Sequence, residues 1–174
     1  MERTFLNNNM GYVHVIPVSN GSSWTLKNIC ADIVSKYRVA RANPDFVVVW
    51  MDREKQACGS AGVEHAIRAA LIKEGVDSGK VHICIPDRMT ENIILADEAV
   101  IRQELGNPAY SYSSEGMNGK SVIRSLFKAT NRNYKETFDG VQLLKKMRLV
   151  RCAQTSASAD RFYQQVKHVN CWWI

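Results

Sequence analysis

Acidic side chains follow two apolar segments of this chain. Asp52 and Glu54 come directly after the first apolar run, and Asp87 and Glu91 come after the second. If the backbone stays extended beyond the first run, side chains two positions apart point to the same side, so Asp52 and Glu54 could face one cation. Hard cations such as Mg²⁺ are commonly held by one or two carboxylates, with water and substrate phosphate completing the shell. The spacing is therefore suited to metal-assisted phosphate chemistry.

The acids also have a structural interpretation. An Asp-x-Glu segment after a strand is, in isolation, more often the polar end of that strand or a helix cap than a metal site. The second acidic pair favours the metal site, because mutually repelling acids usually persist where a cation neutralises them. If the two apolar runs form neighbouring parallel strands, all these acids meet at the carboxyl edge of the sheet, where ligands of such sheets bind.

Alternating strand and helix patterns surround these acids. Short β-branched runs at 11–18, 46–51 and 81–86 predict strands, and apolar residues spaced three and four apart predict helices at 23–38 and 60–74. The order strand, helix, strand, helix, strand predicts an α/β fold with a parallel sheet of three to four strands flanked by helices. The acids then lie at one edge of that sheet.

The remainder of the chain is helical and basic in pattern. One helix or two short ones are expected at 89–105, and helices are expected at 120–130, 139–149 and 158–169. The segment 106–119, rich in Gly, Ser, Asn and Tyr, is either a functional flap or a disordered excursion. We therefore divide the chain into an α/β core, residues 1–105, and a helical basic extension, residues 106–174, packed on the core.

Charge is distributed unevenly between the two halves. Residues 1–100 carry 11 Lys and Arg against 12 Asp and Glu, whereas residues 101–174 carry 12 against 5. A basic surface can meet a polyanion such as nucleic acid, and the alternative is an ordinary solvated basic face.

Four cations recur every fourth residue after the long loop. Lys120, Arg124, Lys128 and Arg132 would line one helix face if the helix continued that far, and Lys135 follows shortly after. Such a face next to an acidic metal crevice suits phosphodiester chemistry, because the cations hold backbone phosphates without reading sequence. Lys120, directly after a glycine that permits close approach, is the candidate to reach the scissile phosphate.

Several segments resemble a known family. The segment "FVVVWMDREK" resembles the Asp-x-Asp segment of the topoisomerase-primase (Toprim) fold, with Glu54 in place of the second Asp. The segments "IPDRMTENIILAD", "GKS", "YKETFDG" and "TSASADRF" resemble small bacterial Toprim-like proteins. Members of that family are typically encoded beside an ATPase of the OLD (overcoming lysogenisation defect) or ABC type, in loci associated with anti-phage defence.

The resemblance implies a Toprim/Rossmann-like nuclease subunit. Asp52, Glu54 and Glu91 would bind Mg²⁺ or Mn²⁺ and, with Lys120, form the catalytic set. DNA or RNA would be the substrate, held by the basic residues, and the partners would be the ATPase and other subunits in a homo- or hetero-oligomer.

Two other functions are weighed against the nuclease. A Toprim domain opens with an apolar strand ending in Glu-Gly, and this sequence begins at the segment that follows it. The expected lack of that strand and its glutamate favours a noncatalytic module that binds nucleic acid or the ATPase. A small nucleotide-binding regulator ranks last, because no Gly-rich phosphate loop is present. No apolar stretch approaches the ~18 residues that span a bilayer, so a cytoplasmic protein without membrane contact is expected.

Overall fold

The computed structural model describes residues 17, 25–40, 46–54, 56–113 and 115–168. Their fold is α/β, and within them the sheet has two strands, β1 (Val47–Trp50) and β2 (Val81–Cys84). The strands are parallel, in a register that pairs Val47 with Val81 and Trp50 with Cys84. The parallel sheet expected from the sequence is confirmed for these strands. The strand expected at 11–18 lies outside the described residues except for Pro17, so a third or fourth strand stays a prediction.

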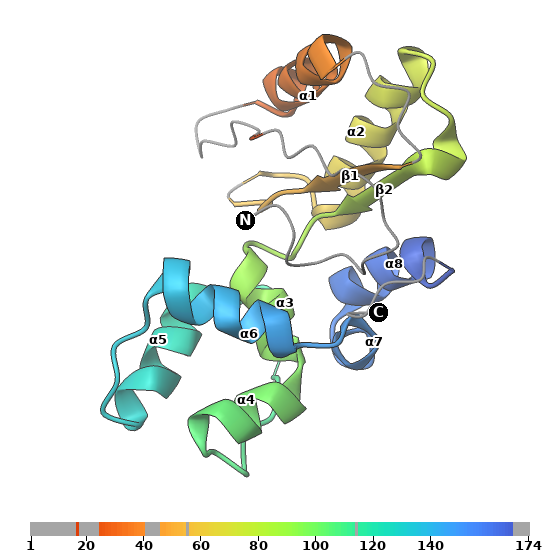
Figure 1. The fold of residues 1–174 in the computed structure, drawn as a ribbon. Helices are drawn as coiled ribbons and strands as arrows, with labels where there is room; N and C mark the ends of the chain where they lie inside the picture. The colour runs from red at the N-terminus through yellow and green to blue at the C-terminus, as the bar shows by residue number, and fades with distance from the viewer. Residues whose placement is uncertain (1–16, 18–24, 41–45, 55, 114, 169–174) are drawn as a thin grey trace.

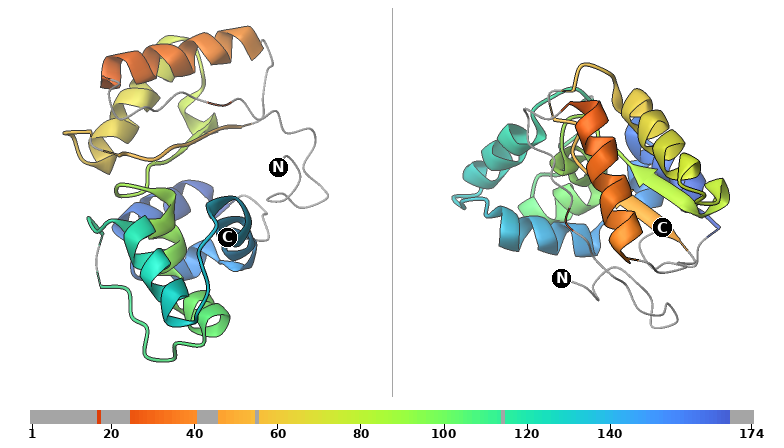
Figure 2. Two further views of the ribbon diagram at one scale, coloured as in Figure 1. Left: turned by 90° about the vertical axis from the view of Figure 1, so that its left-hand side faces the viewer. Right: turned by 90° about the horizontal axis from the view of Figure 1, so that it is seen from above.

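Two helices cover one face of the sheet (Figures 1 and 2). Helix α2 (Ser60–Lys73) connects β1 to β2, and α1 (Leu26–Ala40) packs on α2. The short 3₁₀ helix η1 (Ser78–Lys80) leads into β2. The buried apolar side chains of these helices are the ones that the sequence periodicity selects, which are Ile29, Ile33, Val63, Ile67 and Leu71. They form one hydrophobic cluster with the β1 and β2 side chains, which fixes the sheet against the helices.

Helix α8 (Ala157–Val166) closes the free edge of β2. The backbone N–H of Ile83 donates to Gln165 Oε1 at 2.9 Å, and Gln165 Nε2 donates back to the Ile83 carbonyl at 3.2 Å. These are the two backbone groups that a neighbouring strand would pair with. Because Gln165 satisfies both, a further strand of this sheet would have to pair with β1.

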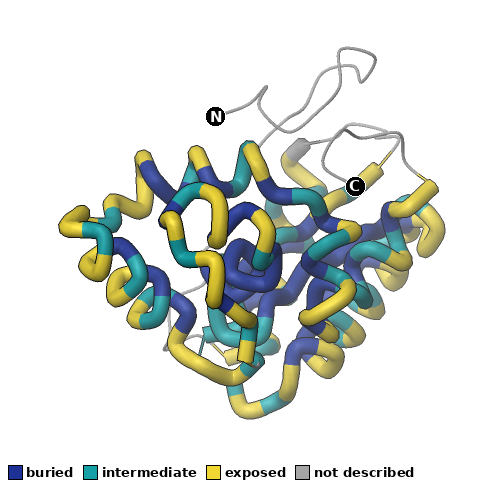
Figure 3. Tube along the Cα trace, turned by 90° about the horizontal axis from the view of Figure 1, so that it is seen from below, coloured by how far each residue is buried: buried dark blue, intermediate teal, exposed yellow. Residues whose placement is uncertain are grey.

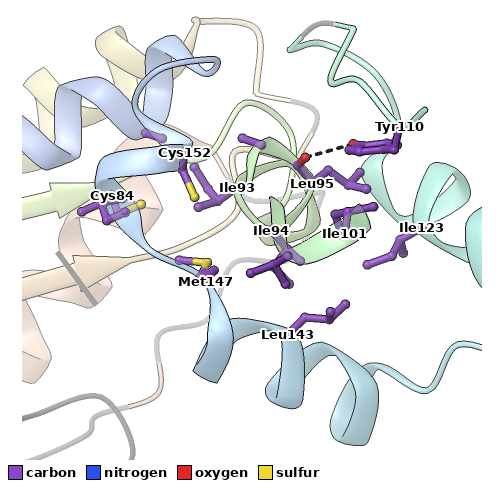
Figure 4. Packing of buried hydrophobic residues seen from close by; sticks show 14 of the residues in the cluster. Cys84, Ile93, Ile94, Leu95, Ile101, Tyr110, Ile123, Leu143, Met147 and Cys152 are labelled. Carbon is purple, nitrogen blue, oxygen red and sulfur yellow. Dashed lines mark hydrogen bonds between the residues drawn. The ribbon is translucent and has the colours of Figure 1, made fainter. Parts of the chain in front are cut away.

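A second hydrophobic cluster lies on the other side of the sheet (Figure 4). Figure 3 shows that buried segments lie in the interior of the trace and exposed segments at its periphery. The buried side chains of this second cluster come mainly from helices α3 (Thr90–Ala96), α4 (Glu98–Leu105), α5 (Gly119–Ala129), α6 (Val141–Lys146), α7 (Leu149–Cys152) and α8. The π-helical turn η2 (Glu136–Gly140) leads into α6. In Figure 4 the hydroxyl of Tyr110 donates to the Leu95 carbonyl, which fixes the start of the 106–119 segment on α3. The two clusters thus group α3 and α4 with the C-terminal helices.

Asp97 separates α3 from α4, so that of the alternatives predicted at 89–105 the two short helices are confirmed. This fully buried carboxylate accepts a hydrogen bond from Val100 N, which starts α4, and it also binds the Arg151 guanidinium at 2.7 to 3.0 Å. Arg148 N donates to it at 2.8 Å, at the break between α6 and α7. The helix predicted at 139–149 is therefore wrong as one continuous element, because Asp97 takes the backbone N–H at that break.

Helix α5 ends earlier than the basic pattern requires. Asn131 has a positive φ of 56°, and Arg132 N donates back to Phe127 O at 3.0 Å, which is the hydrogen bond of a Schellman C-cap. The predicted face of four cations is therefore wrong at Arg132, which lies beyond the helix. No helix in the described part of the chain is long and apolar enough to cross a membrane.

Candidate functional site

Asp52 stands where β1 ends and ties that strand to α3. Its Oδ1 accepts hydrogen bonds from Thr90 N and from Thr90 Oγ1, each at 2.7 Å, and Trp50 Nε1 donates to the same hydroxyl at 3.0 Å. Asp52 therefore caps the N-terminus of α3 from another segment. Both bonds fall on Oδ1, and no hydrogen bond from the described residues falls on Oδ2. That second oxygen can accept a further ligand.

Glu91 lies in the first turn of α3, next to the residue that Asp52 binds. Its side chain is buried, with the residue 7% exposed. Burial raises the pKa of Glu91, the charge of Lys120 opposes that rise, and the Asp52 carboxylate adds to it. A carboxyl buried beside a second carboxylate gains ionisation when a cation arrives. The structure thus brings Asp52, Glu91 and Lys120 within electrostatic reach of one another.

Glu54 does not follow Asp52 in an extended segment. Its φ is +54°, and its N–H donates to the Arg88 carbonyl at 2.8 Å, so the backbone turns at this residue. The extended geometry that would place Asp52 and Glu54 on the same side therefore ends at Glu54. Its role as a metal ligand stays a prediction.

Asp87, in the second acidic pair, forms an ion pair with Arg53 of the same protein. Arg53 Nη2 and Nε donate to Asp87 Oδ1 at 2.7 and 3.1 Å. Arg88 donates to the Gly116 carbonyl at 3.0 Å, which connects the same loop to the 106–119 segment. Asp87 is thus engaged in holding the loops at this edge of the sheet together.

Lys120 lies in the first turn of α5, which packs beside α3. A Cβ added to the preceding Gly119 would lie 2.9 Å from Asn92 N, which is closer than real Cβ contacts, so this position requires glycine. The sequence predicted that this glycine permits a close approach, and the neighbour that approaches is the backbone of α3. Docking of the two helices places the start of α5 beside α3, the helix that carries Glu91. The ammonium of Lys120 forms an ion pair with Glu136 on η2.

The remaining predicted cations have separate surroundings. Arg124 Nη2 lies 3.8 Å from Glu136 Oε1 and so joins Lys120. Lys128 is exposed, and Arg132 lies over the Phe127 ring, 4.7 Å from its centroid. Lys135 N donates to Asp139 Oδ2 at 2.7 Å. The structure therefore gathers Lys120 and Arg124 at one carboxylate and distributes the others along the neighbouring surface.

Two residues of this region were missed as site candidates. Tyr134 has a pKa raised by burial and, next, by the charges of Glu91 and Glu136, and its hydroxyl lies where a Cβ on Gly140 would be 2.6 Å away. Glu136 pairs with both cations of α5. Both residues belong to the "YKETFDG" segment, which the family resemblance singled out without assigning them a role.

The 106–119 segment is ordered where it meets α8. Glu115 Oε1 accepts hydrogen bonds from Ser158 N at 2.7 Å and from the hydroxyls of Ser156 and Ser158. A carboxylate at a helix N-terminus is stabilised by the free N–H groups there. The described residues of this segment form a loop packed against the core, not a disordered excursion, and a function as a flap stays a prediction.

The donor set can be compared with what a divalent cation needs. The described residues contain no group of three or more His, Cys, Asp or Glu side chains placed to hold a metal ion. Asp52 binds Thr90 and Glu91 is the next residue of α3, so two carboxylates belong to this corner of the fold. Carboxylates with water are the donors that Mg²⁺ commonly takes, so these residues fit such a cation in their chemical type.

Comparisons with protein-family models, with curated proteins and with solved structures found no match.

Proposed function

We propose that this chain is a metal-dependent nuclease subunit of the Toprim-like kind that cleaves phosphodiester bonds of DNA or RNA. The observation that carries the proposal is that Asp52 at the end of β1 caps α3, the helix whose first turn holds Glu91, while the start of α5, which carries Lys120, packs against α3. Two acids next to a cation at this edge of a parallel sheet provide the charges that metal-assisted phosphoryl chemistry uses.

Each residue has a role that follows from its surroundings. Asp52, fixed by Thr90, and Glu91, desolvated beside it, would hold Mg²⁺ or Mn²⁺, with Glu54 as a further ligand. The bound cation would supply Lewis-acid polarisation of the phosphate and an activated water. Lys120 would contact a non-bridging phosphate oxygen, and Arg124, Lys128, Arg132 and Lys135 would hold flanking phosphates.

The expected partners derive from the family resemblance. A subunit of this kind would work in the cytoplasm with an ATPase of the OLD or ABC type, as part of anti-phage defence and within a homo- or hetero-oligomer. Its activity is therefore tested both alone and with the ATPase encoded next to it.

Cleavage of plasmid DNA and of RNA, with Mg²⁺ or Mn²⁺, tests the proposal. Asp52→Asn is the sharpest variant, because the amide oxygen can still accept both Thr90 hydrogen bonds while the charge is lost. We expect Asp52→Asn and Glu91→Gln to abolish cleavage and to weaken Mn²⁺ binding measured by calorimetry. The matched control is Asp77→Asn, because Asp77 caps η1 at the opposite end of β2. Cleavage by Asp52→Asn at the wild-type rate would contradict the metal site.

A noncatalytic module is the second candidate, and a specific observation favours it. Asp87 is neutralised by Arg53 and Asp52 caps α3, so both acids have structural roles without a metal. Two results together would favour this candidate over the nuclease. The protein would bind nucleic acid equally well with and without Mg²⁺ or Mn²⁺, and it would not cleave it in the presence of the ATPase.

A further inference from the structure

Glu136 occupies the point where two cations of α5 converge. Lys120 Nζ pairs with Glu136 Oε1, and Arg124 Nη2 lies 3.8 Å from that same oxygen. Lys120 and Arg124 are one helical turn apart, so their head groups can approach a single anion. An anionic oxygen of the chain itself therefore stands where these cations would receive a phosphate oxygen.

The position of Glu136 does not depend on that ion pair. The turn η2 is anchored by Asp139, which accepts hydrogen bonds from Lys135 N at 2.7 Å and from Arg132 Nη2 at 3.3 Å. Asp139 is buried, with the residue 9% exposed, whereas the Glu136 side chain is 43% exposed. Loss of the Glu136 charge should leave η2 in place, because the anchoring bonds belong to its neighbours.

The ion pair is of a kind that an incoming anion can replace. The Lys120 side chain is 36% exposed, and exposed ion pairs contribute only about 0.2 to 1 kcal/mol. A phosphate offers several acceptor oxygens to Lys and Arg and so forms stronger charge-assisted hydrogen bonds. When a phosphate replaces the Glu136 carboxylate, Lys120 and Arg124 each keep an anionic partner.

We propose that Lys120 and Arg124 form a phosphate-binding subsite, which Glu136 fills in the free protein as an internal competitor. The ligand is one phosphate group of a nucleic-acid strand, next to the Asp52 and Glu91 pair. Glu136 thereby lowers the affinity of Lys120 and Arg124 for polyanions until a nucleic-acid strand displaces its carboxylate. The assignment of the ligand rests on the proposed function, whereas the competition between Glu136 and an anion follows from the ion pairs alone.

Anion binding by Glu136→Gln tests the subsite. Fluorescence anisotropy with labelled DNA and RNA strands, without divalent metal, measures affinity, and inorganic pyrophosphate serves as a competitor. We expect the variant to bind a strand up to about five-fold more tightly at low salt, which is the factor that corresponds to an exposed ion pair. The gain should fade at high salt, because screening weakens exposed charges, and it should disappear when Lys120→Met is added.

The matched control is Glu74→Gln. Glu74 forms an exposed ion pair with Arg38 between α1 and α2, so this variant changes the net charge equally and far from α5 (Figure 1). It should bind strands as the wild type does. Equal gains in both variants, or no gain in Glu136→Gln, would overturn the subsite. A gain for pyrophosphate alone would overturn its assignment to nucleic acid.

The two proposals fail in distinguishable ways. If the wild type cleaves nucleic acid and Glu136→Gln binds no more tightly, the internal competition is refuted and the nuclease stands. If Glu136→Gln binds strands more tightly and neither protein cleaves under any condition, the subsite stands and the nuclease is refuted.

Discussion

At the scale of single residues, the site is defined by a buried carboxyl and its neighbours. Glu91 is buried in the first turn of α3. The charges of the Asp52 carboxylate and the Lys120 ammonium both influence its pKa. A structural carboxylate such as Asp97 is surrounded by donors, whereas burial is the largest influence on Glu91. Glu91 also interacts with the Tyr134 hydroxyl, so its burial, which raises its pKa, is what makes it a candidate functional carboxyl.

The raised pKa of Glu91 predicts how stability depends on pH. The folded state binds this proton more tightly than the unfolded state does, so the contribution is fully present below the ordinary glutamate pKa of about 4.3 and is lost as the pH rises through the folded-state pKa. We expect Glu91→Gln to be more stable than the wild type at neutral pH, with a flatter pH dependence in urea denaturation. Added Mn²⁺ should stabilise the wild type at neutral pH and leave the variant unaffected. Equal pH slopes in the two proteins would contradict this assignment.

At the scale of elements, the contact between α3 and α5 decides where Lys120 lies. The contact is close because Gly119 has no side chain and Asn92, which is 1% exposed, packs directly against it. Asn92 Nδ2 also donates to the Met117 carbonyl at 3.1 Å, which fixes the end of the 106–119 segment before α5 begins. The basic helix is therefore positioned by a glycine and a buried amide.

Gly119→Ala should separate these helices. The added methyl group would meet the α3 backbone, so we expect a loss of about 1 to 3 kcal/mol in the free energy of unfolding, measured by chemical denaturation. Gly79→Ala is the matched control, because its Cβ would lie 3.5 Å from Asp77 Oδ1 in ordinary contact. We expect it to change stability by no more than about 0.5 kcal/mol. Equal effects of the two substitutions on the free energy of unfolding would contradict the requirement for glycine at position 119.

At the scale of the whole molecule, α8 connects the two hydrophobic clusters. Gln165 pairs with the Ile83 backbone of β2 and receives a hydrogen bond from Arg68 of α2 at 2.6 Å. Through one side chain, the last described helix therefore holds both the sheet edge and the helix that covers the sheet. These hydrogen bonds of Gln165 to Ile83 and Arg68 attach the basic C-terminal part of the chain to the α/β part.

Replacement of Gln165 should expose the edge of β2. Gln165→Ala leaves the Ile83 N–H and C=O without their partner, so we expect the free energy of unfolding to fall by about 1 to 3 kcal/mol. The open edge should also increase self-association in sedimentation experiments, because unpaired strand edges join other chains. The neighbouring Gln164→Ala is the control, since among the described residues Gln164 bonds to Asp160 and Lys167 on the surface of α8. Wild-type stability of Gln165→Ala would refute the role of the side chain as a substitute strand.

The sequence by itself determined the elements of the described region. Apolar spacing located α1, α2 and α8 to within a few residues, and β-branched runs located β1 and β2, because burial of one face imposes a period that the residues must follow. It also selected Asp52, Glu91 and Lys120, because their types and their places after strands or a glycine are local features.

Only the tertiary structure decided how those residues meet. Asp97 binds the backbone at the break in the helix predicted at 139–149, about 50 positions away in the chain, and Asn131 stopped α5 before Arg132. The pairing of Glu136 with Lys120 and Arg124 was equally absent from any local pattern. Local periodicity reports which face of an element is buried, whereas the partner of a charge depends on which distant segments pack against that element.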